Sequence, residues 1–228
     1  MRVLALETST EFGSCALWQD GETLSADCPA DAPHSMTLLP LAQRLLAAAQ
    51  CDFAALDAIA FDMGPGAFTG LRVACGIAQG MAMALGKPTL PIGSLECMAH
   101  AAGGDRVLSL LDARMGEIYA GAFRASKTLG PQAAGTIQIL KPEAIILPDD
   151  WPETDAVQVV GNALLAYPDL AGRFRHCRRL PQIRPHARNL AELAAQALVR
   201  GEGTDPALAL PRYVRNNVAR TLAERAAA

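Results

Sequence analysis

The sequence has few aromatic residues, and it lacks the long apolar runs of a membrane protein. Aromatic side chains make up 5% of its 228 residues. The longest charge-free apolar segment of the spanning type covers residues 73–86, which is shorter than the roughly 20 residues that a membrane-spanning helix needs. Glu7 interrupts the first apolar run, so a secretory signal is not indicated either. We therefore expect a cytoplasmic protein that does not enter a membrane.

Several patterns of catalytic and metal-binding residues are also missing. The six cysteines form no C-x-x-C pair, the four histidines form no H-x-x-x-H pair, and no G-x-S-x-G sequence occurs. These absences argue against a zinc or iron site and against the nucleophile of an α/β-hydrolase. Because a domain of this size buries a core without cross-links, we expect reduced and mostly buried thiols. An apolar fraction of 51% and a net charge of −3 exclude a disordered chain.

Acidic and basic residues are distributed unevenly. Residues 1–104 carry 10 acids and 4 bases, whereas residues 105–228 carry 13 acids and 16 bases. Six of the arginines lie between residues 173 and 188, and no Asp or Glu occurs from 170 to 191. Two interpretations stay open: an RNA-binding or other anion-binding surface, or a basic loop whose arginines pair with acids from other segments. The candidates for RNA contact are Arg173, Arg175, Arg178 and Arg179.

The two halves of the chain begin with the same pattern of an apolar run, a polar turn and a return strand. The matching strands are residues 3–6 and 14–18 in the first half, and 107–110 and 118–123 in the second. A carboxylate follows the first strand of each half, Glu7 in one and Asp112 in the other. The repeat predicts a duplicated α/β unit with a cleft between the copies. We place the units at residues 1–104 and 105–211, with a C-terminal segment of about 212–228 that packs back on the first.

The first half also contains two candidate helices. One covers about residues 34–50, where Ser35 is a candidate N-cap and Pro40 bends the helix or marks its first turn. Its leucines lie on two lines, which predicts burial on more than one side. The other helix covers about residues 69–86 and follows a strand at 58–61. Further expected elements are strands at 88–92, 136–140 and 156–160, a helix capped by Ser94 that ends near Gly103, a helix with an Asn189–Glu192 capping box that ends at Gly201, and a terminal helix capped by Asn216 or Asn217.

The second candidate helix is rich in small residues. Gly76 and Gly80 lie four residues apart, although each glycine costs a helix interior about 0.8–1.0 kcal/mol relative to alanine. They share one face, and their missing side chains let another backbone approach closely. Either this face packs on the protein's own sheet or it receives a helix of a partner. The glycine-rich loop at 64–70 lacks the Lys-Ser/Thr of a Walker A loop, so a tight strand-to-helix turn is favoured over phosphate binding.

Six segments together resemble a known protein family. In chain order they are Leu4–Thr10, His34–Pro40, Gly64–Arg72, Asp112–Glu117, Gly161–Asn162 and Pro211–Arg215. The most specific of them is the G-P-G-x-F-T-G-L-R run at 64–72. The segments span nearly the whole chain, and their order and spacing are similar to those of the bacterial TsaB family, formerly YeaZ, of the tRNA threonylcarbamoyladenosine (t6A) pathway.

The resemblance implies an α/β protein of the actin/Hsp70/sugar-kinase (ASKHA) fold, with two similar subdomains whose mixed sheets are flanked by helices. It implies a non-catalytic subunit of the complex that modifies N6 of adenosine 37 in tRNA, with TsaD as the catalytic subunit and TsaE as the ATPase. It also implies a homodimer when the chain is alone, tRNA contact through the complex, no intrinsic cofactor, and ATP with Mg²⁺ only in the assembled complex. TsaD-type proteins carry a metal-binding histidine pair, which this sequence lacks.

The family also implies roles for particular residues. Its first two helices pack against those of TsaD or of a second copy, which implies an interface made by His34, Leu38, Leu41, Leu45, Gly70, Ala74, Gly76 and Gly80. The two polar turns would be vestigial phosphate or nucleotide loops, with Glu7, Thr8, Ser9, Thr10, Asp112 and Arg114. The sequence has Glu7 where the family usually has Asp, and we expect the longer side chain to disfavour nucleotide hydrolysis. Ala67 replaces a common Ser, with little expected effect on the fold.

Two other functions stay open. A small-molecule kinase or ATPase of the same fold needs carboxylates for Mg²⁺, for which Glu7 and Asp112 are the candidates. A direct tRNA-binding module would use the arginines between residues 173 and 188. ATP turnover by the isolated protein would favour the first alternative, and salt-sensitive tRNA binding would favour the second.

Overall fold

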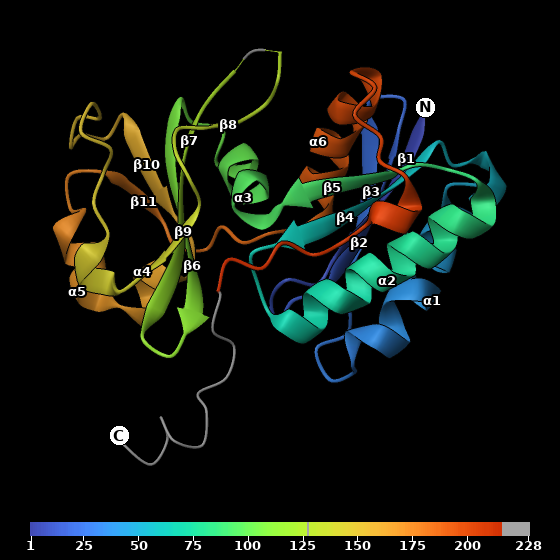
Figure 1. The fold of residues 1–228 in the computed structure, drawn as a ribbon, viewed down its shortest axis with the longest axis horizontal. Helices are drawn as coiled ribbons and strands as arrows, with labels where there is room; N and C mark the ends of the chain where they lie inside the picture. Colours follow the sequence, from blue (N-terminus) through green and yellow to red (C-terminus); the bar gives the residue numbers. More distant parts are fainter. Residues whose placement is uncertain (127, 216–228) are drawn as a thin grey trace.

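The computed structural model describes residues 1–126 and 128–215, which form two α/β units side by side (Figure 1). The sheet of the first unit has the order β3-β2-β1-β4-β5. β1, β2 and β3 are antiparallel neighbours, whereas β4 and β5 run parallel to β1. Its strands are β1 (Arg2–Glu7), β2 (Ser14–Gln19), β3 (Glu22–Asp27), β4 (Ala58–Gly64) and β5 (Thr89–Gly93).

The sheet of the second unit repeats this topology. Its order is β11-β10-β6-β7-β8, and β9 also pairs with β7. β6 and β7 form an antiparallel hairpin, and β10 and β11 run parallel to β6, as β4 and β5 do to β1. The strands are β6 (Arg106–Arg114), β7 (Glu117–Arg124), β8 (Gln132–Ala133), β9 (Gln138–Leu140), β10 (Val157–Val160) and β11 (Arg178–Leu180). The duplicated unit predicted from the sequence is therefore confirmed.

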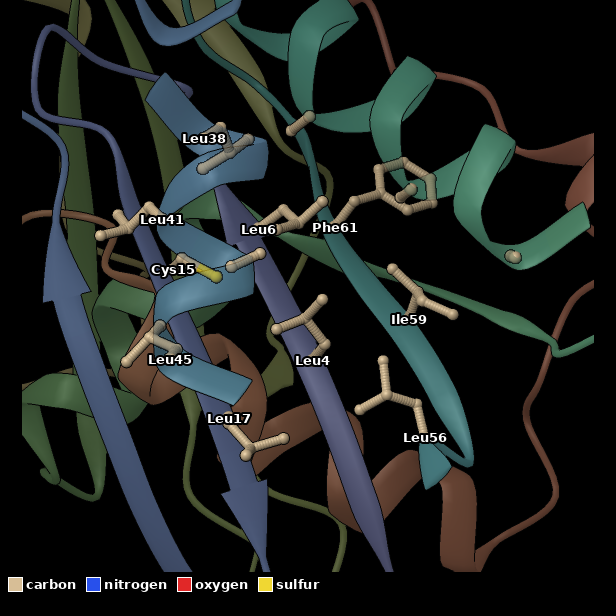
Figure 2. Packing of buried hydrophobic residues seen from close by; sticks show 14 of the residues in the cluster. Leu4, Leu6, Cys15, Leu17, Leu38, Leu41, Leu45, Leu56, Ile59 and Phe61 are labelled. Atoms are coloured by element: carbon tan, nitrogen blue, oxygen red, sulfur yellow. The ribbon is translucent and has the colours of Figure 1, made fainter. Parts of the chain in front are cut away.

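Helices cover both faces of the first sheet. α1 (His34–Ala48) and α2 (Phe68–Leu85) lie on one face, where they bury leucines and a phenylalanine of the sheet (Figure 2). α6 (Ala187–Val199) covers the other face, and α3 (Ser94–Ala102) packs against α6 and against the second sheet. The outer face of the second sheet is covered by α4 (Ala163–Ala166), α5 (Pro168–Arg173) and Trp151. Short 3-10 turns are η1 (Phe53–Ala55), η2 (Pro142–Ala144) and η3 (Pro206–Leu208).

The helix starts differ from three sequence expectations. Ser35 does not cap α1, because the helix begins one residue earlier, after Pro33, without a side-chain cap. Ser94 is the first residue of α3 rather than its cap, and its hydroxyl donates to Asp62 instead. α6 begins at Ala187, where the preceding histidine ring accepts from the Arg188 N–H, so the Asn189–Glu192 capping box is wrong. Pro40 lies inside α1, and the expected terminal helix falls outside the described residues.

The chain returns to the first unit before residue 211. The apolar side of α6, which includes Leu190 and Ala194, lies in the core cluster with Val3 and Ala5 of β1. The predicted second unit of 105–211 is therefore wrong for α6, because sequence order does not reveal which sheet a late helix covers. All six cysteines are free and four of them are buried, as predicted.

Candidate functional site

The small residues of α2 divide between two opposite faces of the helix. Ala74, Ala78 and Ala82, spaced at four-residue intervals, are buried in the core beneath α2. A Cβ atom added at Gly76 or at Gly80 would meet nothing within 4 Å. The alternative that these glycines serve close packing on the protein's own sheet is therefore wrong, since the alanines do that and the glycines face outward.

The outward sides of α1 and α2 carry exposed apolar residues beside the two glycines, next to polar positions such as Arg44. Met36 of α1 is 71% exposed, Leu39 is also exposed, and Met83 of α2 is 62% exposed. By length and composition alone α2 is long and apolar enough to cross a membrane, and 28% of it is buried inside the protein. This segment was not recognised from the sequence, because only the charge-free residues 73–86 were counted. The helix itself includes Arg72 and extends back to Phe68. We call Met36, Leu39, Gly76, Gly80 and Met83 the outer face.

Several residues expected at a partner interface are instead part of the chain's own core. Leu38, Leu41 and Leu45 are 0%, 3% and 6% exposed and point from α1 onto the first sheet (Figure 2). Ala74 is buried beneath α2. A Cβ at Gly70 would lie 1.8 Å from the Thr8 carbonyl oxygen, so this glycine permits α2 to touch the β1–β2 turn. These positions were wrongly assigned because the more regular leucine line marks the buried side of a helix.

His34 at the start of α1 lies half-buried above the β1–β2 hairpin. A Cβ at Gly13 would be only 2.4 Å from His34 Nδ1, so the ring occupies the space that this glycine leaves. Burial lowers the pKa of His34. The residue thus joins α1 to the hairpin, and only its exposed edge is open to a partner.

The two polar turns that were predicted to be vestigial phosphate or nucleotide loops meet at the cleft between the units. Ser9 and Thr10 from the first turn line a cavity together with Asp112 and Arg114 from the second. Asp112 is fixed by the N–H of Arg114 at 2.9 Å and by the Tyr167 hydroxyl at 3.0 Å, both of which donate to its Oδ1. The sequence therefore predicted correctly that these two turns lie at the cleft. It gave no indication that Tyr167 contacts Asp112.

This cavity does not fit a nucleotide. Its volume is about 70 Å³, whereas small-molecule sites enclose roughly 300–1,000 Å³. Glu7 and Thr8 lie buried beneath it rather than in its wall, and the Thr8 hydroxyl donates to the Gly70 carbonyl at 2.7 Å. Among the described residues, no group of three or more His, Cys, Asp or Glu side chains is placed to hold a metal ion. A second cavity, of about 390 Å³, lies next to the first between the glycine-rich loop and the β6–β7 turn, with Phe68 and Arg215 in its lining.

Glu7 forms a buried acidic pair with Asp62, a residue that the sequence reasoning did not single out. Glu7 Oε1 accepts from the Ser9 N–H at 2.7 Å and from the Ser9 hydroxyl at 2.5 Å. Asp62 Oδ1 accepts from the Gly64 N–H at 2.7 Å and from the Ser94 hydroxyl at 2.6 Å. Burial raises the pKa of Glu7 well above its usual range, and the neighbouring Asp62 charge adds to this; burial also raises the pKa of Asp62 to about 6.

The arginine-rich stretch does not act as one group. Arg173 donates to the carbonyl groups of Pro142 and Glu143, and Arg179 donates to the Ala171 carbonyl at 3.1 Å, so both serve the local backbone. Outside the four RNA-contact candidates, Arg184 lies 3.8 Å from Asp27 of the first unit.

The other two candidates, Arg175 and Arg178, are exposed. Among residues 1–126 and 128–215, neither of their side chains makes a hydrogen bond or an ion pair. Contacts within the protein thus account for some of the arginines between residues 173 and 188, and RNA contact by the exposed ones stays a prediction.

Comparison with known proteins identifies the family. A family model described as "TsaD: tRNA N6-adenosine threonylcarbamoyltransferase" matches residues 29–222. The tRNA threonylcarbamoyladenosine biosynthesis protein TsaB of Escherichia coli K12 is 34% identical over 96% of both chains. The chain belongs to the TsaB (YeaZ) family. The TsaB protein of Haemophilus influenzae is 42% identical over 52% of each chain.

Solved structures agree with this family and its fold. YeaZ from Pseudomonas aeruginosa superposes with a TM-score of 0.82 at 36% identity, covering 93% of this chain and 99% of that one. A second P. aeruginosa structure, described as an uncharacterized protein with similarity to peptidase YEAZ, gives 0.84 at 37% identity and covers 94% and 99%. With its duplicated mixed sheets flanked by helices, the TsaB-family chain has the predicted ASKHA fold.

Proposed function

We propose that this TsaB-family chain is a non-catalytic partner subunit for t6A formation at adenosine 37 of tRNA, and that it binds TsaD through the outer face of α1 and α2. The observation that carries the proposal is the outward position of Gly76 and Gly80 on a long apolar helix. Exposed apolar surface of this kind marks a protein interface in a water-soluble protein. Because the glycines add no side chain, a partner helix can approach the α2 backbone closely.

The same face is suited to self-association in the absence of TsaD. A two-fold dimer uses one patch on both copies, and a smooth apolar face is complementary to itself. We therefore propose that the isolated chain forms a homodimer through the outer face, and that TsaD and the second copy compete for it. TsaE and tRNA join through the assembled complex in this proposal, as do ATP and Mg²⁺.

The cleft supports a role without catalysis by this chain alone. The cavity of about 70 Å³ between the two polar turns leaves no room for a nucleotide, and Glu7, a candidate Mg²⁺ ligand, is buried and accepts two hydrogen bonds from Ser9. Glu11, Asp112 and Arg114 also line this cavity, and the Asp112 carboxylate is held by the Arg114 N–H and the Tyr167 hydroxyl. These features favour a positioning subunit over the kinase or ATPase alternative.

The test is co-purification with TsaD from the same cell after a bulky substitution on the outer face. Gly76→Trp places a large side chain where the partner helix would lie, and tryptophan is more favourable than glycine in a helix, so the fold is retained. Gly172→Trp is the matched control, because a Cβ at Gly172 also meets nothing within 4 Å but lies on α5 of the second unit. We expect Gly76→Trp to lose TsaD and Gly172→Trp to keep it. TsaD retained by a folded Gly76→Trp protein would overturn the proposal.

A further inference from the structure

The segment after α6 crosses the first unit and ends on the second (Figure 1). Thr204 forms an antiparallel bridge with Thr89 at the start of β5. Ala209 is buried in the core beneath α2, and the Arg212 N–H donates to the Met63 carbonyl at 2.7 Å. Up to Arg212, these contacts fix the segment to the first unit.

Arg215 lies on the second unit, three residues later. Its guanidinium donates to Glu117 Oε2 at 2.5 Å and to the Ala113 carbonyl at 3.1 Å, and it contacts Met115 Sδ at 3.4 Å. The side chain is half-buried between these groups. Ala113 lies at the end of β6, Met115 in the turn and Glu117 at the start of β7, so Arg215 joins the C-terminal segment to the tip of this hairpin.

The β6–β7 turn needs such support. Arg114 and Met115 have φ angles of 59° and 56°, in the left-handed region that residues other than glycine rarely adopt. Such a conformation persists only where surrounding contacts hold it. The turn forms one wall of the inter-unit cavity, opposite Ser9 and Thr10. Its position therefore sets the width of the cleft.

Tyr213 fixes the other end of the connection on α2. Its hydroxyl accepts from Arg72 Nε at 3.0 Å, and its ring lies 5.4 Å from the Phe68 ring. The Arg72 guanidinium stacks over Phe68 at 3.8 Å. These contacts hold Tyr213 to the first turns of α2 by aromatic and cation–π packing.

We propose that Tyr213–Arg215 form a strap that ties the start of α2 to the β6–β7 turn and holds the cleft between the two units closed. One end of the strap is bonded to each unit, and the left-handed turn that it holds carries Asp112 and Arg114 to the loop of Ser9 and Thr10. Release of Arg215 frees that turn and widens the cleft. The strap lies within a single chain, so its action does not depend on the identity of a partner.

The test is amide hydrogen exchange of the full chain with Arg215→Met. Methionine keeps the unbranched stem of arginine but removes its donors to Glu117 and Ala113. We expect exchange to become about tenfold faster at residues 112–118, and also at residues 8–12 across the cleft, as the loss of a charge-assisted pair implies. Glu117→Gln retains an acceptor and should give a smaller increase in both regions.

Arg212→Met is the matched control, since the contact of Arg212 with Met63 uses the backbone N–H. It should leave both regions unchanged. Far-UV circular dichroism checks that every variant is folded. If exchange at residues 112–118 is unchanged in folded Arg215→Met, the strap is refuted. If it rises there but not at residues 8–12, Arg215 supports only the turn, and cleft closure is refuted.

Discussion

The buried acidic pair makes a quantitative prediction about stability and pH. Asp62 has no exposed surface, and its Oδ2 atom has no hydrogen-bond partner in the described part of the chain. Its pKa rises from 3.8 to about 6 through burial. At about 1.4 kcal/mol per pKa unit, this shift costs the folded state about 3 kcal/mol once both folded and unfolded forms are ionised.

The sign follows from proton binding. Between about pH 4 and pH 6 the folded protein holds the Asp62 proton more tightly than the unfolded chain does, so the free energy of unfolding falls as the pH rises. About 1 kcal/mol of the penalty is already present at pH 4.5, which leaves a loss of about 2 kcal/mol between pH 4.5 and 7.5. The pKa of Glu7 is also raised by burial, so Glu7 adds to the loss in the same direction.

Asp62→Asn removes this titration while its carbonyl oxygen still accepts from Gly64 and Ser94. We expect the loss between pH 4.5 and 7.5 to shrink by about 2 kcal/mol relative to the unsubstituted protein. The measurement is urea unfolding at fixed ionic strength, followed by far-UV circular dichroism at several pH values. Asp155→Asn, at an exposed acid, is the control and should change nothing. A variant whose pH dependence equals that of the unsubstituted protein would refute the reasoning.

Two further substitutions test the packing of α2. Gly70→Ala places a Cβ 1.8 Å from the Thr8 carbonyl oxygen, and the backbone shift that follows should lower the free energy of unfolding by about 3 kcal/mol in urea titrations. A decrease in the free energy of unfolding of less than about 0.5 kcal/mol would show that the β1–β2 turn moves aside at little cost, which would contradict the prediction. Gly76→Ala meets nothing and should instead raise stability by about 0.5–1 kcal/mol in the same assay. A lower free energy of unfolding for Gly76→Ala would mean that the added methyl group clashes with another part of the protein.

Much of the fold followed from periodicity in the sequence. The repeated strand–turn–strand pattern predicted the duplicated sheets, because each copy buries its first strand and leaves a polar turn at the same end. α2 was found within one residue at each end, since Gly86 stops it in the left-handed conformation that favours glycine. α4, α5 and β11 were missed, because each has six residues or fewer and short elements carry little periodic signal.

The candidate site was less predictable, because helix periodicity does not say which apolar line faces the sheet. Leu38, Leu41, Leu45 and Leu46 of α1 are buried, whereas Met36 and Leu39 are exposed. Asp62 was missed for a different reason. Its importance comes from burial beside Glu7, which lies 55 residues earlier and meets it only through the parallel pairing of β1 with β4. A single sequence contains no local sign of that pairing.

The asymmetry between the two units argues for where a partner binds. In the first unit, α2 connects β4 to β5 as one helix of 18 residues. At the equivalent place in the second unit, between β10 and β11, Pro168 separates two short helices, α4 and α5. The duplicated topology is thus the same, but within residues 1–126 and 128–215 only the first unit presents a continuous helical face with outward glycines. This difference between two otherwise matching units is why we place the partner on the outer face of α1 and α2.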